Sequence, residues 1–240
     1  MNSLRVNDMS ANYLFPPRPV TALTIRGDER QFPINRIFCV GRSYQAHAAE
    51  MGDKIDKTTQ EPFYFIKDLN AIQASGTDLT YPPGTEDLHY EMEWVVAIDQ
   101  PGFEVDEEKA ESMIYGYACG LDMTRRDLQQ KGKDKRRPWD LGKNFEGGAI
   151  ITDLVPKATT GILNNGTIAL RVNGETKQSA DISDLIWSPA ELVMHLSKYY
   201  HLKPGDLIFT GTPEGVGPVV RGDRIEGSVE GVGSISLNIV

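Results

Sequence analysis

The chain has 240 residues, of which 40% are hydrophobic and 25% charged, so it can bury one sizeable core and does not have the composition of a disordered protein. A formal charge of −9 and a pI near 5.0 leave no basic face for a phosphate backbone, which argues against nucleic-acid binding. Apolar runs are too short for a membrane span.

Two sequence features remain ambiguous on composition alone. The two cysteines, Cys39 and Cys119, each lie within an apolar run, which favours two small buried side chains over a disulfide framework and is typical of a cytoplasmic protein. The basic stretch KGKDKRR at residues 131–137 is either a solvated surface or a place where an anion binds. Both interpretations of this stretch stay open.

The first half of the chain mixes short strands and helices irregularly. Residues 1–34 indicate a polar start followed by two short strands in an edge hairpin, and residues 36–40 form a buried strand that Gly41 ends. Residues 44–51 have a helical composition.

The middle of the chain continues this mixture. Residues 62–66 and 93–98 are rich in strand formers, and residues 116–121 form another short apolar strand. Residues 104–115 predict an amphipathic helix with acidic residues near its start, and residues 125–131 predict a second helix.

The second half contains the clearest local signals. Residues 168–172 are followed by Asn173-Gly174, which favours a type I′ hairpin turn. Ser188-Pro189-Ala190-Glu191 predicts a helix with a serine N-cap, a proline in the first turn and a capping glutamate. Residues 204–240 alternate glycine turns with short strands, as a rolled or barrel-like β-structure does.

Strands and helices do not alternate regularly, which argues against a doubly wound parallel sheet. The sequence therefore predicts an α+β fold dominated by strands, with a few short helices. We expect a short N-terminal extension at residues 1–34 and one catalytic domain at residues 35–240.

A candidate metal site consists of carboxylates. Glu91 and Glu93 are two residues apart, so on a strand both side chains point to one face. Asp122 ends the apolar strand YGYACGL, where a strand end can open into a cleft. Three carboxylates without histidine or cysteine suit Mg²⁺, Mn²⁺ or Ca²⁺ better than zinc. A solvated strand edge is the alternative interpretation.

A candidate general base lies in the segment GRSYQAHAAEMG. His47 and Glu50 are three residues apart and are neighbours on a helix, where a carboxylate raises the basicity of an imidazole and orients it. An incidental surface ion pair is the alternative. Lys67 and Lys143 follow apolar or aromatic stretches, and each either faces a cleft or packs its stem on the surface.

The glycine-rich segment TGTPEGVG at residues 210–217 can hold an anion on its backbone amides, or it is a plain turn. It lacks the lysine and the spacing of a P-loop, so a nucleotide site is not expected.

Together these segments resemble the fumarylacetoacetate hydrolase family over residues 35–240. The motifs that carry the resemblance follow in the family's order: CVGRSYQAHAAEMG, HYEMEWVVAID, YGYACGLDMTRRDLQ, PWDLGKNF, VNGETKQSADISDLIWS and PGDLIFTGTPEGVG. The likeness is greatest to the short acylpyruvate hydrolase branch, in particular to the hydrolases that cleave fumarylpyruvate in gentisate breakdown.

The resemblance implies a mixed β-roll catalytic fold, usually a homodimer, that cleaves a carbon–carbon bond in a small diketo acid with Mg²⁺. It also implies roles for single residues. Glu91, Glu93 and Asp122 match the metal ligands. His47 and Glu50 match the pair that activates water, on a segment that acts as a lid in relatives. Lys143 matches a lysine that contacts substrate, and the positions that match substrate contacts are Arg42, Tyr44, Lys67, Arg126, Gln129 and Thr212.

Two rival functions remain open. A lyase such as an oxaloacetate decarboxylase, or an isomerase of a related diacid, would use the same metal site without an activated water. A non-catalytic binding protein would keep the fold alone, but no metal-matching carboxylate and no matching histidine is missing from this chain.

Overall fold

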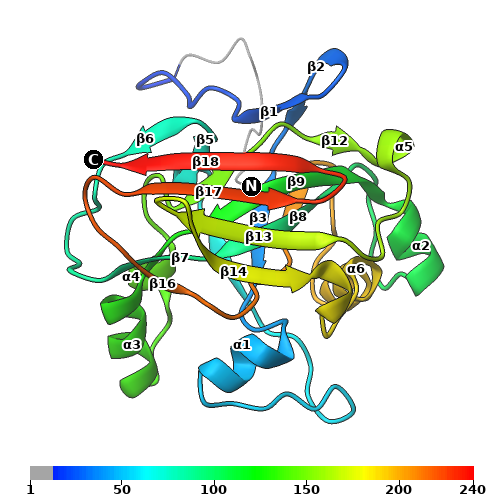
Figure 1. Cartoon of the computed structure of the whole chain (residues 1–240). Helices are drawn as coiled ribbons and strands as arrows, with labels where there is room; N and C mark the ends of the chain where they lie inside the picture. The colour runs from blue at the N-terminus through cyan, green and yellow to red at the C-terminus, as the bar shows by residue number, and fades with distance from the viewer. Residues whose placement is uncertain (1–12) are drawn as a thin grey trace.

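The computed structural model describes residues 13–240, so residues 1–12 of the expected polar start lie outside the described residues. Two β-sheets pack face to face (Figure 1). The larger sheet has the strand order β4 (Tyr64–Lys67), β3 (Arg36–Val40), β15 (Asp206–Phe209), β8 (Met92–Ile98), β9 (Ile114–Asp122), β11 (Ala149–Ile151) and β5 (Ile72–Ala74), with β12 (Val155–Pro156) beside β9. The smaller sheet has the order β14 (Glu175–Asp181), β13 (Thr167–Val172), β17 (Arg224–Val229), β18 (Gly233–Ile239) and β6 (Thr77–Leu79).

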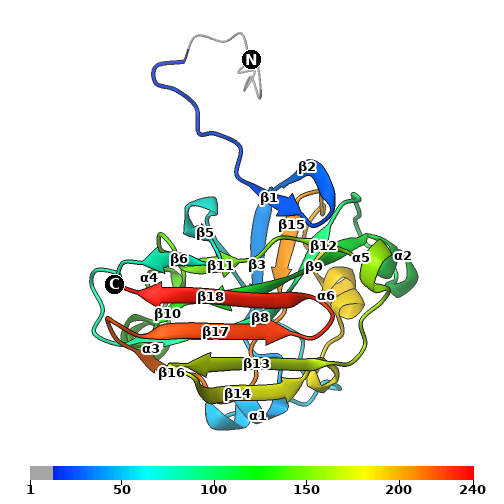
Figure 2. The same ribbon diagram turned by 45° about the horizontal axis from the view of Figure 1, so that its top comes forward.

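Shorter elements surround the two sheets. A separate hairpin joins β1 (Ala22–Ile25) to β2 (Asp28–Pro33), and a short sheet has the order β10 (Thr124–Arg125), β7 (Leu88–Tyr90) and β16 (Gly217–Val219). The helices are α1 (Gln45–Glu50), α2 (Glu107–Ser112), α3 (Arg126–Asp134), α4 (Asp140–Lys143), α5 (Lys157–Thr160) and α6 (Pro189–Ser197), with 3₁₀ turns at Leu69–Ala71 and Ile182–Asp184. Figure 2 shows the smaller sheet from β18 through β17 and β13 to β14, with α1 below β14.

Both faces of the larger sheet are buried, which explains the nearly continuous apolar run in β8. Trp94 and Val96 face the smaller sheet and join the main hydrophobic cluster. Val95 and Ala97 face the other way and join a second cluster, which the β1–β2 hairpin covers with Leu23 among others. Because successive side chains alternate, the face of each residue in this strand follows from its position.

The structure confirms the strand at 36–40, the hairpin after Ile25 and the α+β, strand-rich fold class. At the Asn173-Gly174 turn both residues have positive φ angles, 52° and 83°, as a type I′ turn requires. The predicted capping box of α6 is also present: Ser188 Oγ accepts from the N–H of Glu191, whose side chain accepts from the N–H of Ser188. Short-range interactions decide these elements, so the local sequence predicts them.

The helix predicted at 104–115 is wrong at both ends. Glu104 has a φ of 49°, and the helix begins only after Asp106, whose carboxylate accepts from the N–H of Lys109. Its last residue is Ser112, because Ile114 already pairs with β8 in the larger sheet. Sheet pairing therefore overrides the helical pattern of these residues.

Two further boundaries differ from the sequence prediction. The strand expected at 62–66 is β4, displaced toward Lys67, and the helix expected at 125–131 continues to Asp134.

Cys39 and Cys119 are buried free thiols, as predicted. Among residues 13–240, every helix is too short or too polar to cross a bilayer. The domain boundary after residue 34 stays a prediction.

Candidate active site

Glu91, Glu93 and Asp122 lie together at one end of the larger sheet. Met92 pairs with Leu121 across β8 and β9, which places Glu91 opposite Asp122, and the Asp122 N–H donates to the Glu91 carbonyl at 2.9 Å. One carboxylate oxygen of each residue lies within 4.8 Å of one oxygen of each of the others, and all three side chains are buried. Burial of the three carboxylates rules out the solvated strand edge.

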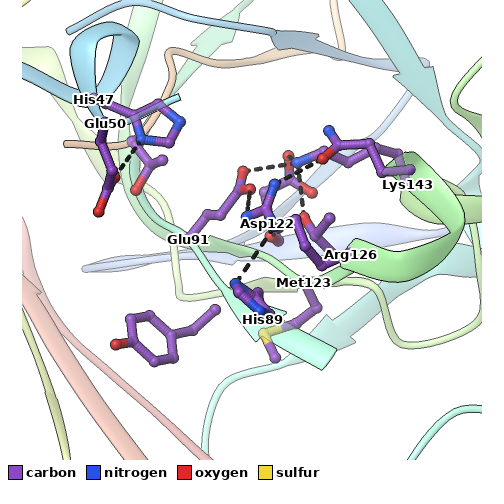
Figure 3. A network of polar contacts seen from close by, with 12 residues as sticks. His47, Glu50, His89, Glu91, Asp122, Met123, Arg126 and Lys143 are labelled. Atoms are coloured by element: carbon purple, nitrogen blue, oxygen red, sulfur yellow. Dashed lines mark hydrogen bonds and ion pairs between the residues drawn. The ribbon is translucent and has the colours of Figure 1, made fainter. Parts of the chain in front are cut away.

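Lys143, at the end of α4, points its ammonium into this carboxylate cluster (Figure 3). Its Nζ lies 2.7 Å from Glu91 Oε2, 2.8 Å from Asp122 Oδ2 and 2.7 Å from Thr124 Oγ1. Burial alone lowers the pKa of a lysine, but Asp122 and Glu91 outweigh burial and hold the pKa of Lys143 above its ordinary value. Lys143 is therefore a fixed cation beside the carboxylates, which decides between the two interpretations that the sequence left open, and its contact with substrate stays a prediction.

Lys67 is fully buried on β4 and supports the same cluster from the protein interior. Its Nζ lies 2.7 Å from Asp122 Oδ1, an ion pair without hydrogen-bond geometry. It donates to the backbone carbonyls of Met123 at 3.2 Å and Gly148 at 2.9 Å, and to that of Lys143. These contacts are structural, so the expected substrate contact of Lys67 stays a prediction.

Arg126, at the start of α3, is the second cation on Glu91. Its Nη2 lies 2.6 Å from Glu91 Oε1, and its Nη1 donates to Gln129 Oε1 at 2.7 Å. Its Nε donates to His89 Nδ1 at 3.4 Å, while His89 Nε2 lies 2.9 Å from Asp87 (Figure 3). The sequence did not indicate His89, which orients Arg126. Arg126 and Gln129, both predicted substrate contacts, thus lie beside the metal-matching carboxylates.

The three carboxylates differ in how far their charge is compensated. Burial raises the pKa of Glu91, but Lys143 and Arg126 outweigh it, and its pKa lies below the ordinary value. Within residues 13–240, Glu93 has no lysine or arginine partner, and burial together with Asp122 and Glu91 raises its pKa well above the ordinary value. A cation next to Glu93 would offset this uncompensated charge.

A divalent ion fits this donor set. The ligands would be Glu91, Glu93 and Asp122, which offer carboxylate oxygens, the donors that Mg²⁺, Mn²⁺ and Ca²⁺ prefer. Among residues 13–240, Glu93 has a backbone N–H but no lysine or arginine as partner, and this observation favours an ion over a purely internal network.

The glycine-rich turn at 210–217 binds internal carboxylates. The Gly211 N–H donates to Glu93 Oε2 at 2.8 Å, and the Gly215 N–H donates to Glu50 Oε1 at 3.1 Å. Gly211 has a φ of 101°, and a Cβ at this position would lie 2.6 Å from the Cβ of Ser43. The turn is therefore more than a plain connection, but the anions that it holds belong to the protein.

His47 and Glu50 form a hydrogen-bonded pair on α1, as predicted. His47 Nδ1 lies 3.0 Å from Glu50 Oε2, and the Gly215 N–H fixes the other oxygen of Glu50. Figure 3 shows the pair next to Glu91, and His47 is close enough to influence the pKa of that carboxylate. In the described part of the chain Nε2 of His47 has no hydrogen-bond partner. Donation from Nδ1 to Glu50 leaves Nε2 as the basic atom.

The remaining predicted substrate contacts have varied surroundings. Arg42 is ion-paired with Asp53. Tyr44 is buried, its hydroxyl has no hydrogen-bond partner among residues 13–240, and burial raises its pKa. Thr212 Oγ1 accepts from Gln178 Nε2 at 2.8 Å, so this hydroxyl has a protein partner. The substrate roles of Arg42, Tyr44 and Thr212 stay predictions.

Gln178 is a supporting residue that the sequence analysis missed, although it lies in the quoted motif VNGETKQSADISDLIWS. Its Oε1 accepts at 2.9 Å from the N–H of Met92, the residue between the two glutamates. Its Nε2 donates to Thr212 Oγ1 and to the carbonyl of Pro213, both at 2.8 Å. Gln178 therefore joins the carboxylate strand to the glycine-rich turn.

We expect Gln178→Leu to destabilise the protein by about 1–3 kcal/mol, because it leaves buried hydrogen-bonding groups unpaired. The melting temperature should fall by about 2–12 °C and the affinity for Mn²⁺ by about 10-fold. Thermal unfolding with and without Mn²⁺ measures both. The exposed Gln130→Leu on α3 is the control, and an unchanged melting temperature in Gln178→Leu would contradict the supporting role.

Comparison with known proteins agrees with this geometry. The family model described as fumarylacetoacetate (FAA) hydrolase C-terminal matches residues 36–240. The chain belongs to the fumarylacetoacetate hydrolase family. Within the family, a fumarylpyruvate hydrolase from Ralstonia sp is 53% identical over 189 residues, which cover 79% of this chain and 98% of that protein.

Other family members extend the comparison. A crystal structure of fumarylpyruvate hydrolase from Pseudomonas aeruginosa in complex with Mn²⁺ and pyruvate has a TM-score of 0.91 and 47% identity, and covers 95% of this chain and 99% of that one. An oxaloacetate tautomerase from Escherichia coli (strain K12) is 35% identical over 201 residues, 83% of this chain and 90% of that protein. The mixed β-roll fold expected from the motifs is thereby confirmed.

Proposed function

We propose that this protein hydrolyses the carbon–carbon bond of an acylpyruvate, with fumarylpyruvate as the substrate and fumarate and pyruvate as the products. The observation that carries the proposal is the pair His47–Glu50, whose free Nε2 lies beside a buried cluster of three carboxylates. A lyase needs no base for water, whereas a hydrolase does. The Ralstonia and Pseudomonas relatives support the choice of fumarylpyruvate.

We propose Mg²⁺ as the resident ion, held by Glu91, Glu93 and Asp122. Such an ion supplies a Lewis acid that polarises the oxygens of an α-keto acid and stabilises negative charge on them. Mn²⁺, which is present in the Pseudomonas structure, and Ca²⁺ prefer the same oxygen donors.

The side chains of this chain perform the proton and charge steps. His47 Nε2 takes a proton from water, and Glu50 stabilises the resulting imidazolium through Nδ1. The hydroxide oxygen attacks the acyl carbonyl carbon, the bond between this carbon and the pyruvyl methylene breaks, and its electron pair stays on the pyruvyl group as an enolate. Lys143 offsets the enolate charge, and the proton that His47 took from water passes to the enolate carbon, which yields pyruvate and restores the neutral imidazole.

The direct test follows the ultraviolet absorbance of fumarylpyruvate in the presence of Mg²⁺ and identifies the products. Removal of the ion with EDTA is expected to lower kcat/KM by about 10³-fold, because the polarisation of the substrate is lost. Activity should return with added Mg²⁺ or Mn²⁺. Undiminished turnover in EDTA would exclude a metal-dependent reaction.

Oxaloacetate is the substrate of the second candidate function, since a relative with 35% identity is an oxaloacetate tautomerase. Tautomerisation or decarboxylation of oxaloacetate requires the carboxylate cluster but no water attack. Assays with oxaloacetate beside fumarylpyruvate separate the two functions. Turnover of oxaloacetate alone would replace the hydrolase assignment.

We further propose a homodimer in solution, with the catalytic domain at residues 35–240 of each copy. The family membership supports both proposals. Size-exclusion chromatography with light scattering gives the mass, and a value of 26.6 kDa would show a monomer instead.

A further inference from the structure

Helix α3 carries polar side chains of the active site along one face. Arg126, Gln129 and Lys133 are separated by three and four residues, a spacing that places them on the same side of a helix. The hydrogen bond from Arg126 to Gln129 confirms that the first two lie side by side. Lys133 is half-buried, whereas Lys131 on another face is exposed. The face that pairs with Glu91 through Arg126 therefore continues to Lys133.

Lys133 lies among cations. Its Nζ stands 5.2 Å from the ring centroid of Trp139, and within residues 13–240 it has no carboxylate partner. Burial lowers the pKa of Lys133 to about 8, and the charges of Arg126 and Arg42 add to the effect. Arg126 is already paired with Glu91. A bound anion next to Lys133 would relieve this repulsion between cations.

An aromatic cavity is lined by Trp139, whose ring Lys133 contacts, and by Lys143, which pairs with the carboxylate cluster. The cavity has a volume of about 460 Å³, within the range of small-ligand sites, and Phe63, Phe65, Trp139 and Lys143 are among its lining residues. The rings of Phe63 and Trp139 meet edge to face at 5.3 Å, and the Phe65 ring lies 4.9 Å from Lys143 Nζ. Asp140 and Arg137, which also line the cavity, are both exposed and carry opposite charges.

We propose that Lys133 receives the distal carboxylate of the substrate, whose planar unsaturated acyl group lies along the rings of Phe63 and Trp139. The inference rests on the proposed acylpyruvate hydrolase function and defines its substrate class as acylpyruvates whose acyl group ends in a carboxylate. Aromatic side chains suit a conjugated acyl group, and an ammonium over the Trp139 ring that lacks a carboxylate partner among residues 13–240 suits its terminal charge. An acyl group that ends in a methyl gains nothing from Lys133.

The test compares kcat/KM for fumarylpyruvate, which has the distal carboxylate, with that for acetylpyruvate, which lacks it. Lys133→Met should lower the value for fumarylpyruvate by about 10–100-fold, mainly through KM, since a charge-assisted hydrogen bond is lost. The value for acetylpyruvate should change by less than about 3-fold, because it makes no such bond. Lys133→Arg should recover most of the loss, and the exposed Lys131→Met is the matched control. An equal loss with both substrates would overturn the inference.

A binding measurement keeps the inference testable whatever the enzyme turns over. Isothermal titration calorimetry of the Mn²⁺-loaded protein with fumarate and with crotonate compares a dicarboxylate with a monocarboxylate of similar shape. Lys133→Met should weaken fumarate binding by about 10–100-fold and leave crotonate binding unchanged. Equal effects on the two ligands, or none, would overturn the role of Lys133. Failure of the wild-type protein to cleave either acylpyruvate would instead contradict the proposed function.

Discussion

Replacement of Glu93 by glutamine is expected to lower kcat/KM by about 10³-fold or more and to abolish the rise in melting temperature that Mn²⁺ causes in the wild-type protein. The reason is that Glu93 is a carboxylate of the cluster without a lysine or arginine partner in the described part of the chain. Its charge is the one most available to an added ion.

The same substitution should stabilise the metal-free protein. A buried carboxylate whose charge is not paired costs free energy, and a neutral amide of the same shape removes that cost, so we expect a gain of about 1–3 kcal/mol. Scanning calorimetry with and without Mn²⁺ measures both effects, and Glu86→Gln, in an exposed loop, is the control. A Glu93→Gln protein that keeps the stabilisation by Mn²⁺ would show that the ion binds elsewhere.

Replacement of His47 by alanine is expected to lower kcat by about 10²–10⁴-fold, because water loses its general base. Metal affinity should stay at the wild-type level, since the carboxylate cluster and Lys143 do not depend on His47 for their contacts. Steady-state kinetics and Mn²⁺ titration together separate this defect from that of Glu93→Gln.

Two further variants sharpen this test. Glu50→Gln should cause a smaller loss in kcat, because Nδ1 of His47 loses its anionic partner while the ring remains in place. His201→Ala, at an exposed histidine, is the control. Fumarylpyruvate hydrolysis within twofold of wild type in His47→Ala would remove this residue from the base role.

Short-range chemistry explains which parts of the fold the sequence predicted. The Asn173-Gly174 turn and the capping box at Ser188 depend on neighbouring residues alone, and both are present as expected. The helix expected at 104–115 ends at Ser112, because Ile114 pairs with Ile98 of β8 in the larger sheet. Sequence patterns do not show this pairing, because the partner strand comes from another part of the chain.

The sequence by itself determined which residues could carry the chemistry. A spacing of two on a strand put Glu91 and Glu93 on one face, a spacing of three put Glu50 beside His47, and the order of the motifs indicated the family. These relations follow from the periods of strands and helices, which are fixed by backbone geometry.

Only the tertiary structure decided how charge is distributed among these groups. Lys143 and Arg126 both pair with Glu91, whereas Glu93 is left to a backbone N–H, and no spacing in the sequence distinguishes the two glutamates in this way. The contact of Lys133 with Trp139 is likewise a product of the chain's path after α3. Coulomb interactions and desolvation depend on distance and burial, and packing of distant segments sets both.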